Sequence, residues 1–181
     1  MIELSPAVNT AAELRSAFDR ARAVPQVSQA VEQTEKLLAV RVSGDPYVIR
    51  ISEISGIAHA RKIVALPSAI PEQLGLAGVH GSLVPVYSLA ALLGYSAETG
   101  PGKWLVLCGT EEPVGLAFSD LEGYLVVPSA QIYAAQSDHL TRRHARHMAR
   151  TADAVRAVIS IPAIREAIQG RCGVQGESKE R

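Results

Sequence analysis

Aromatic residues are scarce in this chain: Phe, Trp and Tyr together make up 4% of its 181 residues, although 48% of them are hydrophobic. Any core must therefore be built from Val, Ile, Leu and Ala. A chain of this length forms one domain or two small subdomains, and about 70% of the surface of its unfolded state can be buried. The composition is typical of a globular protein.

Cysteine is nearly absent, and long apolar runs are absent altogether. Cys108 lies in an apolar segment and Cys172 in a polar one, without the spacing of metal ligands, so we expect two reduced thiols. No segment approaches the ~20 apolar residues that span a bilayer, and the first ten residues lack a basic region followed by an apolar one. We therefore expect a cytoplasmic protein without direct membrane insertion.

An excess of either charge is also lacking, because 18 Lys and Arg residues balance 18 Asp and Glu residues. A neutral chain offers no overall attraction to nucleic acid or to an anionic membrane. A local basic patch is the exception, and without interleaved aromatic side chains it suits solvent or an acidic protein surface better than nucleic acid. The patch consists of Arg142, Arg143, Arg146, Arg150 and Arg156.

Motifs for catalysis or metal binding are lacking too. His139, His144 and His147 form the one histidine cluster, and no Cys, Asp or Glu is spaced to complete a metal site. The candidate serines lack the glycine pattern of a nucleophile elbow. We therefore predict a protein that is not an enzyme and that holds neither metal nor cofactor.

Residues 1–36 are predicted to form an N-terminal helical extension. Thr10 and Glu13 fit a capping box, and the apolar residues that follow share one helical face until Pro25 ends the helix. Such a helix either packs on its own domain or docks on a partner, and the sequence leaves both open.

Apolar and polar residues alternate from Leu37 onward, which is the pattern of strands. A β-hairpin is predicted over 37–51 with its turn at Ser43-Gly44-Asp45-Pro46, and a second over 104–118, followed by another strand over 124–127.

The stretch from Gly75 to Gly94 combines a glycine-marked turn, a strand and a short helix. Because Pro85 cannot donate to a sheet ladder, we expect its strand to lie at an edge or to carry a bulge there. Apolar residues at helical spacing then predict a helix from Leu89, which Gly94 ends. The glycines precede a strand, whereas a phosphate-binding loop would precede a helix.

This succession of motifs resembles the CheW-like family, the coupling proteins of bacterial chemotaxis. The match covers 37–168 and includes a Val-x-Glu-Ile element at 51–54, the glycine at Gly75, an Asn-Leu-Arg-Gly motif and a Pro-Val strand at Pro85. Here that motif is Gly78-Val79-His80-Gly81, with Gly and His in place of its Asn and Arg. The resemblance implies a mostly β fold of two small five-stranded β-barrel subdomains packed together. Beyond it, the polar composition of 169–181 predicts a flexible tail.

The sequence allows two structures for residues 136–154, a helix or a strand. Apolar residues from Ala145 to Val155 have helical spacing after a cap at Ser137 or Asp138, whereas the family has a strand begin near here. The sequence leaves both open. Beyond this segment the resemblance implies a last strand through Ile161 and a short helix over 162–168.

In the family the glutamate of the Val-x-Glu-Ile element faces the arginine of the four-residue motif, which implies a contact between Glu53 and His80 here. A guanidinium pairs with a carboxylate through two parallel hydrogen bonds, whereas a neutral imidazole donates only one. A nearby carboxylate also favours protonated imidazole, so such a pair would be sensitive to pH. The alternative is that His80 is a partly exposed loop residue.

The resemblance implies a non-catalytic adaptor. Family members bridge the cytoplasmic tip of a chemoreceptor, a helical hairpin, to the regulatory domain of a sensor histidine kinase. The changed motif also allows a divergent paralogue that binds receptor but not kinase, or that serves a motility pathway other than swimming. By resemblance, the contact candidates are Ile51, Glu53, Gly75, His80, Gly81, Pro85, Val106 and Phe118.

Overall fold

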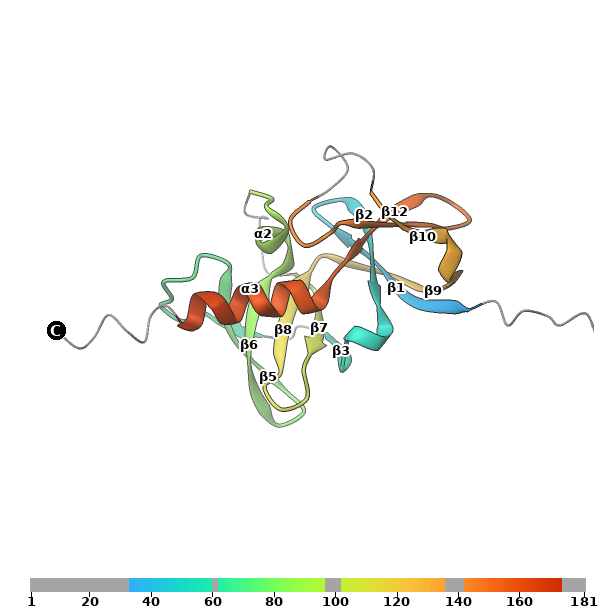
Figure 1. The fold of residues 1–181 in the computed structure, drawn as a ribbon. Coiled ribbons are helices and arrows are strands. Elements are labelled where there is room, and N and C mark those ends of the chain that lie inside the picture. Colours follow the sequence, from blue (N-terminus) through green and yellow to red (C-terminus); the bar gives the residue numbers. More distant parts are fainter. Residues whose placement is uncertain (1–32, 60–61, 97–101, 136–141, 174–181) are drawn as a thin grey trace, which may run out of the picture. The chain divides into compact units, whose positions relative to one another are not determined.

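The computed structural model describes residues 33–59, 62–96, 102–135 and 142–173. In these ranges twelve strands form two six-stranded sheets (Figure 1). The predicted mostly β fold is confirmed, but each sheet is open, with two edge strands, and is not a closed five-stranded barrel. The predicted N-terminal helix lies outside the described residues.

Sheet A is built from two separate parts of the chain. Its strand order is β10-β11-β12-β2-β1-β9. The strands are β1 (Thr34–Val42), β2 (Asp45–Arg50), β9 (Asp120–Pro128), β10 (Ile132–Ala134), β11 (His147–Arg150) and β12 (Val155–Ile159).

Sheet B comes from the single stretch of chain between those two parts. Its strand order is β3-β7-β8-β6-β5-β4. The strands are β3 (Gly56–His59), β4 (Ile63–Val64), β5 (Gln73–Val79), β6 (Ser82–Ser88), β7 (Trp104–Cys108) and β8 (Val114–Phe118).

Three apolar clusters explain how two open sheets make one compact unit. One cluster lies on a face of sheet A and includes Leu37, Val48 and Val158, and a second lies on a face of sheet B and includes Val84 and Leu105. The third and largest cluster joins the other faces of both sheets. Its members from the strands include Leu38, Val40, Ile49, Val106, Leu116 and Phe118. Several strands are therefore buried on both faces, mostly by aliphatic residues, with Phe118, Tyr47 and Tyr87 as the buried aromatic members of the central cluster.

Both predicted hairpins are confirmed. β1 and β2 are joined by a two-residue turn, Ser43 and Gly44, with φ of 51° and 86°. Positive φ at both turn residues matches the twist of the flanking strands. β7 and β8 form the second hairpin, with Trp104 opposite Phe118.

Pro85 was predicted to lie at a sheet edge or a bulge, but β6 is an interior strand between β8 and β5. Pairing of β6 with β8 begins only at Val86, so Pro85 lies just before that ladder. The bulge lies on the neighbouring strand, between Gln73 and Gly75. The missing N–H of Pro85 therefore removes no hydrogen bond of the β8 ladder.

The predicted short helix is confirmed as α2 (Leu89–Leu93). The Ser88 hydroxyl accepts a hydrogen bond from the Ala91 N–H at 3.2 Å, and Gly94 ends the helix with φ of 89°. Both caps satisfy backbone groups that a short helix leaves free.

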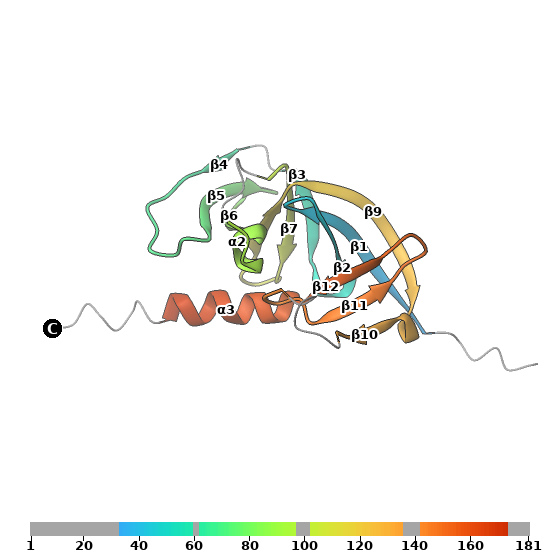
Figure 2. The ribbon, with the colours of Figure 1, turned by 90° about the horizontal axis from the view of Figure 1, so that it is seen from above.

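The ambiguous segment before the last strand is β-structure where it is described, so its helical interpretation is wrong. β11 pairs with β10 and β12, and β12 pairs in parallel with β2. α3 (Ile161–Gly173) follows, so the predicted helix is longer than expected and includes the first residues of the predicted tail. Figure 2 shows α3 leaving β12 and running beside sheet B.

Candidate docking surface

The 3-10 helix η1 (Ile51–Glu53) carries the chain from sheet A to sheet B. The Ile54 N–H donates to the Ile51 carbonyl at 3.3 Å, and the Ser55 N–H donates to the Leu107 carbonyl at 2.8 Å. The predicted site residues Ile51 and Glu53 therefore lie on a short linker whose C-terminal end is tied to β7.

Glu53 joins η1 to two other elements. Its Oε2 accepts a hydrogen bond from the Ile161 N–H at 2.9 Å, and its Oε1 accepts one from Arg50 Nη1 at 3.3 Å. Arg50 Nε also donates to Glu35 Oε2 at 2.7 Å. A carboxylate is favoured at the N-terminus of α3 by the helix dipole. These contacts hold β1, β2, η1 and α3 together.

Arg50 is the charged partner of Glu53, in place of His80. Burial lowers the pKa of Arg50, but Glu35 and Glu53 outweigh it, so the net pKa is raised and the guanidinium stays charged. His80 lies in the β5–β6 turn, and the described residues show no contact between it and Glu53. The described residues contain no Glu53–His80 pair, and the partners of Glu53 there are Arg50 and the Ile161 N–H.

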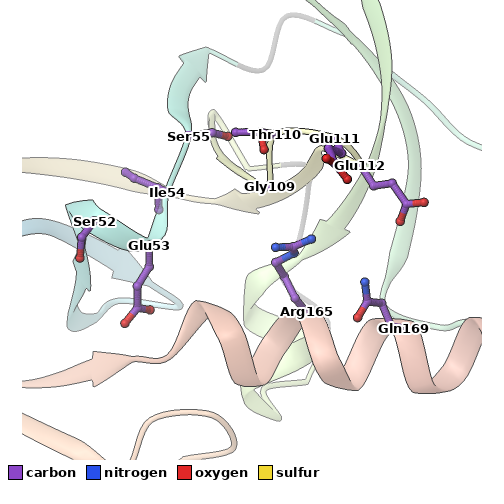
Figure 3. A pocket seen from close by; sticks show the side chains of 10 residues that line it. All are labelled: Ser52, Glu53, Ile54, Ser55, Gly109, Thr110, Glu111, Glu112, Arg165 and Gln169. Atoms are coloured by element: carbon purple, nitrogen blue, oxygen red, sulfur yellow. The ribbon is translucent and has the colours of Figure 1, made fainter.

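Two pockets flank η1, and Ser52 lines both of them. The larger, of about 620 Å³, lies between η1, the β7–β8 turn and α3 (Figure 3). In Figure 3, Arg165 extends from α3 towards Gly109, whereas Glu53 points towards the start of the helix. Its lining is Ser52, Glu53, Ile54, Ser55, Gly109, Thr110, Glu111, Glu112, Arg165 and Gln169.

The second pocket, of about 510 Å³, lies on the sheet A side of η1. It is lined by Thr34, Glu35, Lys36, Arg50, Ile51 and Ser52. The Arg50–Glu35 ion pair therefore forms part of its wall.

Exposed apolar side chains continue the central cluster to the edges of both sheets. Ile57 on β3 is 37% exposed, and Tyr124 and Val126 on β9 are 53% and 52% exposed. Ile57 pairs with Val106, and Tyr124 pairs with Leu38, both of which belong to the central cluster. Cross-strand partners share a face of their sheet, so these exposed residues lie on the faces that the two sheets turn towards each other.

These edges are continuous with the pockets around η1. Lys36, which lines the second pocket, is the cross-strand neighbour of Val126. Ile54 and Ser55, which line the larger pocket, lead directly into β3. We call this region the η1 surface. It comprises Ile51, Ser52 and Glu53 with the exposed apolar residues Ile57, Tyr124 and Val126.

Four other predicted site residues lie together on the β5–β6 hairpin. Gly75 has φ of 139°, and a Cβ there would lie 2.0 Å from the Val64 carbonyl oxygen. His80 and Gly81 form an exposed two-residue turn with φ of 49° and 83°. Gly75 and Gly81 are therefore required by the backbone, and His80 is presented to solvent, as the alternative interpretation of that residue had it.

Val106 and Phe118 are both 0% exposed and belong to the central cluster. A fully buried side chain cannot touch a partner directly. These two residues therefore pack the core and are not contact residues, contrary to the prediction. They support the η1 surface from within the core.

Sequence reasoning did not identify Arg50, Ile57, Tyr124 or Val126. The sequence of 124–127, Tyr-Leu-Val-Val, did indicate a strand with apolar residues on both faces. Which face is covered depends on the neighbouring strands, and a single sequence does not give that.

Among the described residues, no three His, Cys, Asp or Glu side chains gather in a way that could hold a metal ion. Neither α2 nor α3 has the length and hydrophobicity that crossing a membrane requires.

The structure thus has two open sheets joined by a shared apolar layer, with pockets and exposed apolar side chains where the chain passes from one sheet to the other. The family model described as CheW-like domain matches residues 36–169, and the chain belongs to this family.

Among solved structures, the chain is similar to the crystal structure of the scaffolding protein TtCheW from Thermoanaerobacter tengcongensis. The two share 15% identity with a TM-score of 0.62, over 71% of this chain and 90% of that one. At this identity the likeness shows the fold. No curated protein matches the chain.

Proposed function

We propose that this protein is a non-catalytic cytoplasmic adaptor that couples the helical tip of a chemoreceptor to the regulatory domain of a sensor histidine kinase. Membership of the CheW-like family supports the adaptor class, and the similar solved structure is itself that of a scaffolding protein. Coupling of this kind requires surfaces held at a fixed orientation, and it requires no reacting group.

The observation that carries the proposal is the η1 surface. Ile57 on the edge of sheet B and Tyr124 and Val126 on the edge of sheet A are exposed near the two pockets that flank η1, and exposed apolar residues beside pockets suit protein contact. An amphipathic helix presents a complementary apolar stripe, as in other helix-in-groove complexes. The ion pairs of Arg50 with Glu35 and Glu53 hold the pocket walls in place, and the exposed apolar residues take no part in them.

The test is titration calorimetry against a receptor tip fragment and, separately, against the kinase regulatory domain. Binding to both supports the adaptor. Binding to the receptor alone would identify the divergent paralogue, for which the loss of an arginine at His80 is the motivating feature. Binding to neither would contradict the proposal.

Two valine substitutions locate the receptor contact. Val126→Glu places a charge on the η1 surface and is expected to weaken receptor binding by about tenfold or more. Val155→Glu is the matched control, because Val155 is 45% exposed and lies on β12, separated from β9 by β2 and β1. Equal losses in both variants would show that the η1 surface is not the contact.

A further inference from the structure

Two of the five arginines of the basic patch found in the sequence are engaged within the fold. Arg142 is used within the fold, since its guanidinium carbon lies 4.1 Å from the Tyr95 ring centroid and its Nη2 lies 3.8 Å from Asp45 Oδ2. Arg156 is held by Glu122. These two arginines fix neighbouring segments and are not available to a partner.

Arg143 and Arg146 have no carboxylate partner in the part of the chain that the structure describes. Both line a cleft of about 740 Å³, which we call the α3 cleft. It lies between the segment that leads into β11 and the helix α3. Its lining residues are Arg143, His144, Arg146, His147, Ser160, Ala163, Glu166, Ala167 and Arg171.

Positive charge from two separate elements converges on the α3 cleft. The pKa of His144 is lowered, first by burial and then by the charges of Arg171, Arg143 and Arg146. Glu72 ion-pairs with Arg171 and so offsets that charge. The charge left for a ligand comes from Arg143 and Arg146, opposed within the lining by Glu166.

Two small side chains line the α3 side of the cleft. Ala163 and Ala167 are four residues apart on α3, so they lie on one face of the helix and leave space that larger side chains would fill. The lining holds no Phe, Tyr or Trp on which a nucleotide base could stack. Guanidinium groups beside a strip of small apolar residues suit carboxylates carried on a peptide.

We propose that the α3 cleft binds an acidic polypeptide segment of a partner protein, with Arg143 and Arg146 pairing with its carboxylates. This contact is separate from the η1 surface, so it adds a third attachment point to an adaptor and does not depend on receptor binding.

The test uses fluorescence anisotropy with the full chain and a short labelled peptide of alternating Glu and Ala, at low salt. The wild-type protein is expected to bind the peptide, and binding should weaken as salt screens the charges. Arg146→Glu is expected to reduce affinity about tenfold, and Arg143→Glu by a similar factor. Arg143 and Arg146 are both exposed, but Arg143 lies beside Gly94, so Arg146→Glu is expected to fold even if Arg143→Glu does not.

Arg150→Glu is the matched control, because Arg150 is exposed on β11 and lies outside the cleft lining. It makes the same charge change and is expected to leave affinity within about twofold of the wild type. The proposal is overturned if the peptide does not bind, if Arg150→Glu weakens binding as much as Arg146→Glu, or if an oligonucleotide of equal charge binds more tightly.

Discussion

At Gly75 the carbonyl of a neighbouring strand occupies the place of a side chain. A Cβ there would lie 2.0 Å from the Val64 oxygen, and φ is 139°. Gly75→Ala is therefore expected to destabilise the protein by about 3 kcal/mol or more, because the β4–β5 pairing must separate. Urea unfolding at neutral pH measures the change.

Gly78 provides the comparison on the same strand. It is exposed, and an added Cβ would meet no atom within 4 Å. Gly78→Ala is expected to change stability by less than about 1 kcal/mol, in the stabilising direction, because glycine weakens a strand interior. Similar losses in the two variants would show that the close approach at Gly75 does not limit substitution.

Glu53 is the residue on which three elements depend. Glu53→Ala leaves the Ile161 N–H and the guanidinium of Arg50 short of an acceptor, and it is expected to cost about 1–3 kcal/mol of unfolding free energy. Glu53→Gln keeps an acceptor for the N–H and should cost less. Thermal unfolding of both variants measures this order.

His80→Ala tests the partner that the sequence implied for Glu53. Because His80 is exposed and does not contact Glu53, this change should alter stability by less than about 0.5 kcal/mol. A loss of unfolding free energy as large as that of Glu53→Ala would instead support the Glu53–His80 pair expected from the family.

At the scale of elements, the last turn of α3 is attached to the segment before β5 by Arg171 and Glu72. Burial opposes ionisation of Glu72, but the hydrogen bond and charge of Arg171 outweigh it and lower its pKa from the ordinary value of 4.5. A depressed folded-state pKa contributes stability that is fully present above the unfolded value. This stability is lost as pH falls through the folded value.

Glu72→Gln should therefore flatten the acid limb of the stability curve. The measurement is unfolding free energy against pH for both proteins, from neutral pH to below 4.5. The gap between wild type and variant is expected to narrow as pH falls below that value. A gap of constant size would mean that Glu72 acts through packing and not through charge.

Elements with local signals were predictable from the sequence, and elements that depend on distant neighbours were not. The β1–β2 hairpin shows alternation and a turn with Ser43 and Gly44, all within one segment. β11 shows no alternation, because Met148 faces the central cluster while the adjacent Ala149 faces the cluster of sheet A. Both residues are buried, and the period of two disappears.

The candidate site follows the same rule. Ile51 and Glu53 were identified through a local motif and do lie on η1. The ion pair was assigned to the wrong partner, because its geometry depends on how η1 lies against β2 and α3. Tyr124 and Val126 were missed, since their exposure follows from β9 being an edge strand.

At the scale of the whole molecule, the central cluster makes the two sheets one cooperative unit. Cys108 lies in this cluster with 0% exposure, and burial raises the pKa of its thiol to about 12. A thiol that is buried and protonated reacts only when the structure opens. In a Cys172→Ser background, Cys108 should resist thiol reagents until urea unfolds the protein.

The rate of Cys108 labelling, followed against urea, checks this prediction. Labelling should rise together with the loss of native circular dichroism, as expected for a single transition. Fast labelling in native buffer would mean that one sheet opens without the other.

The insertion of one sheet between two parts of the other also orders events during synthesis. All strands of sheet B lie between Gly56 and Phe118, whereas β2 pairs with β12, which ends at Ile159. A chain emerging from the ribosome can therefore complete sheet B while one edge of β2 is still unpaired. That edge is covered only after β12 has been synthesised and pairs with it. During that interval the open edge of β2 is a point at which a second nascent chain can pair, so crowding of translating ribosomes should increase misassembly of this protein.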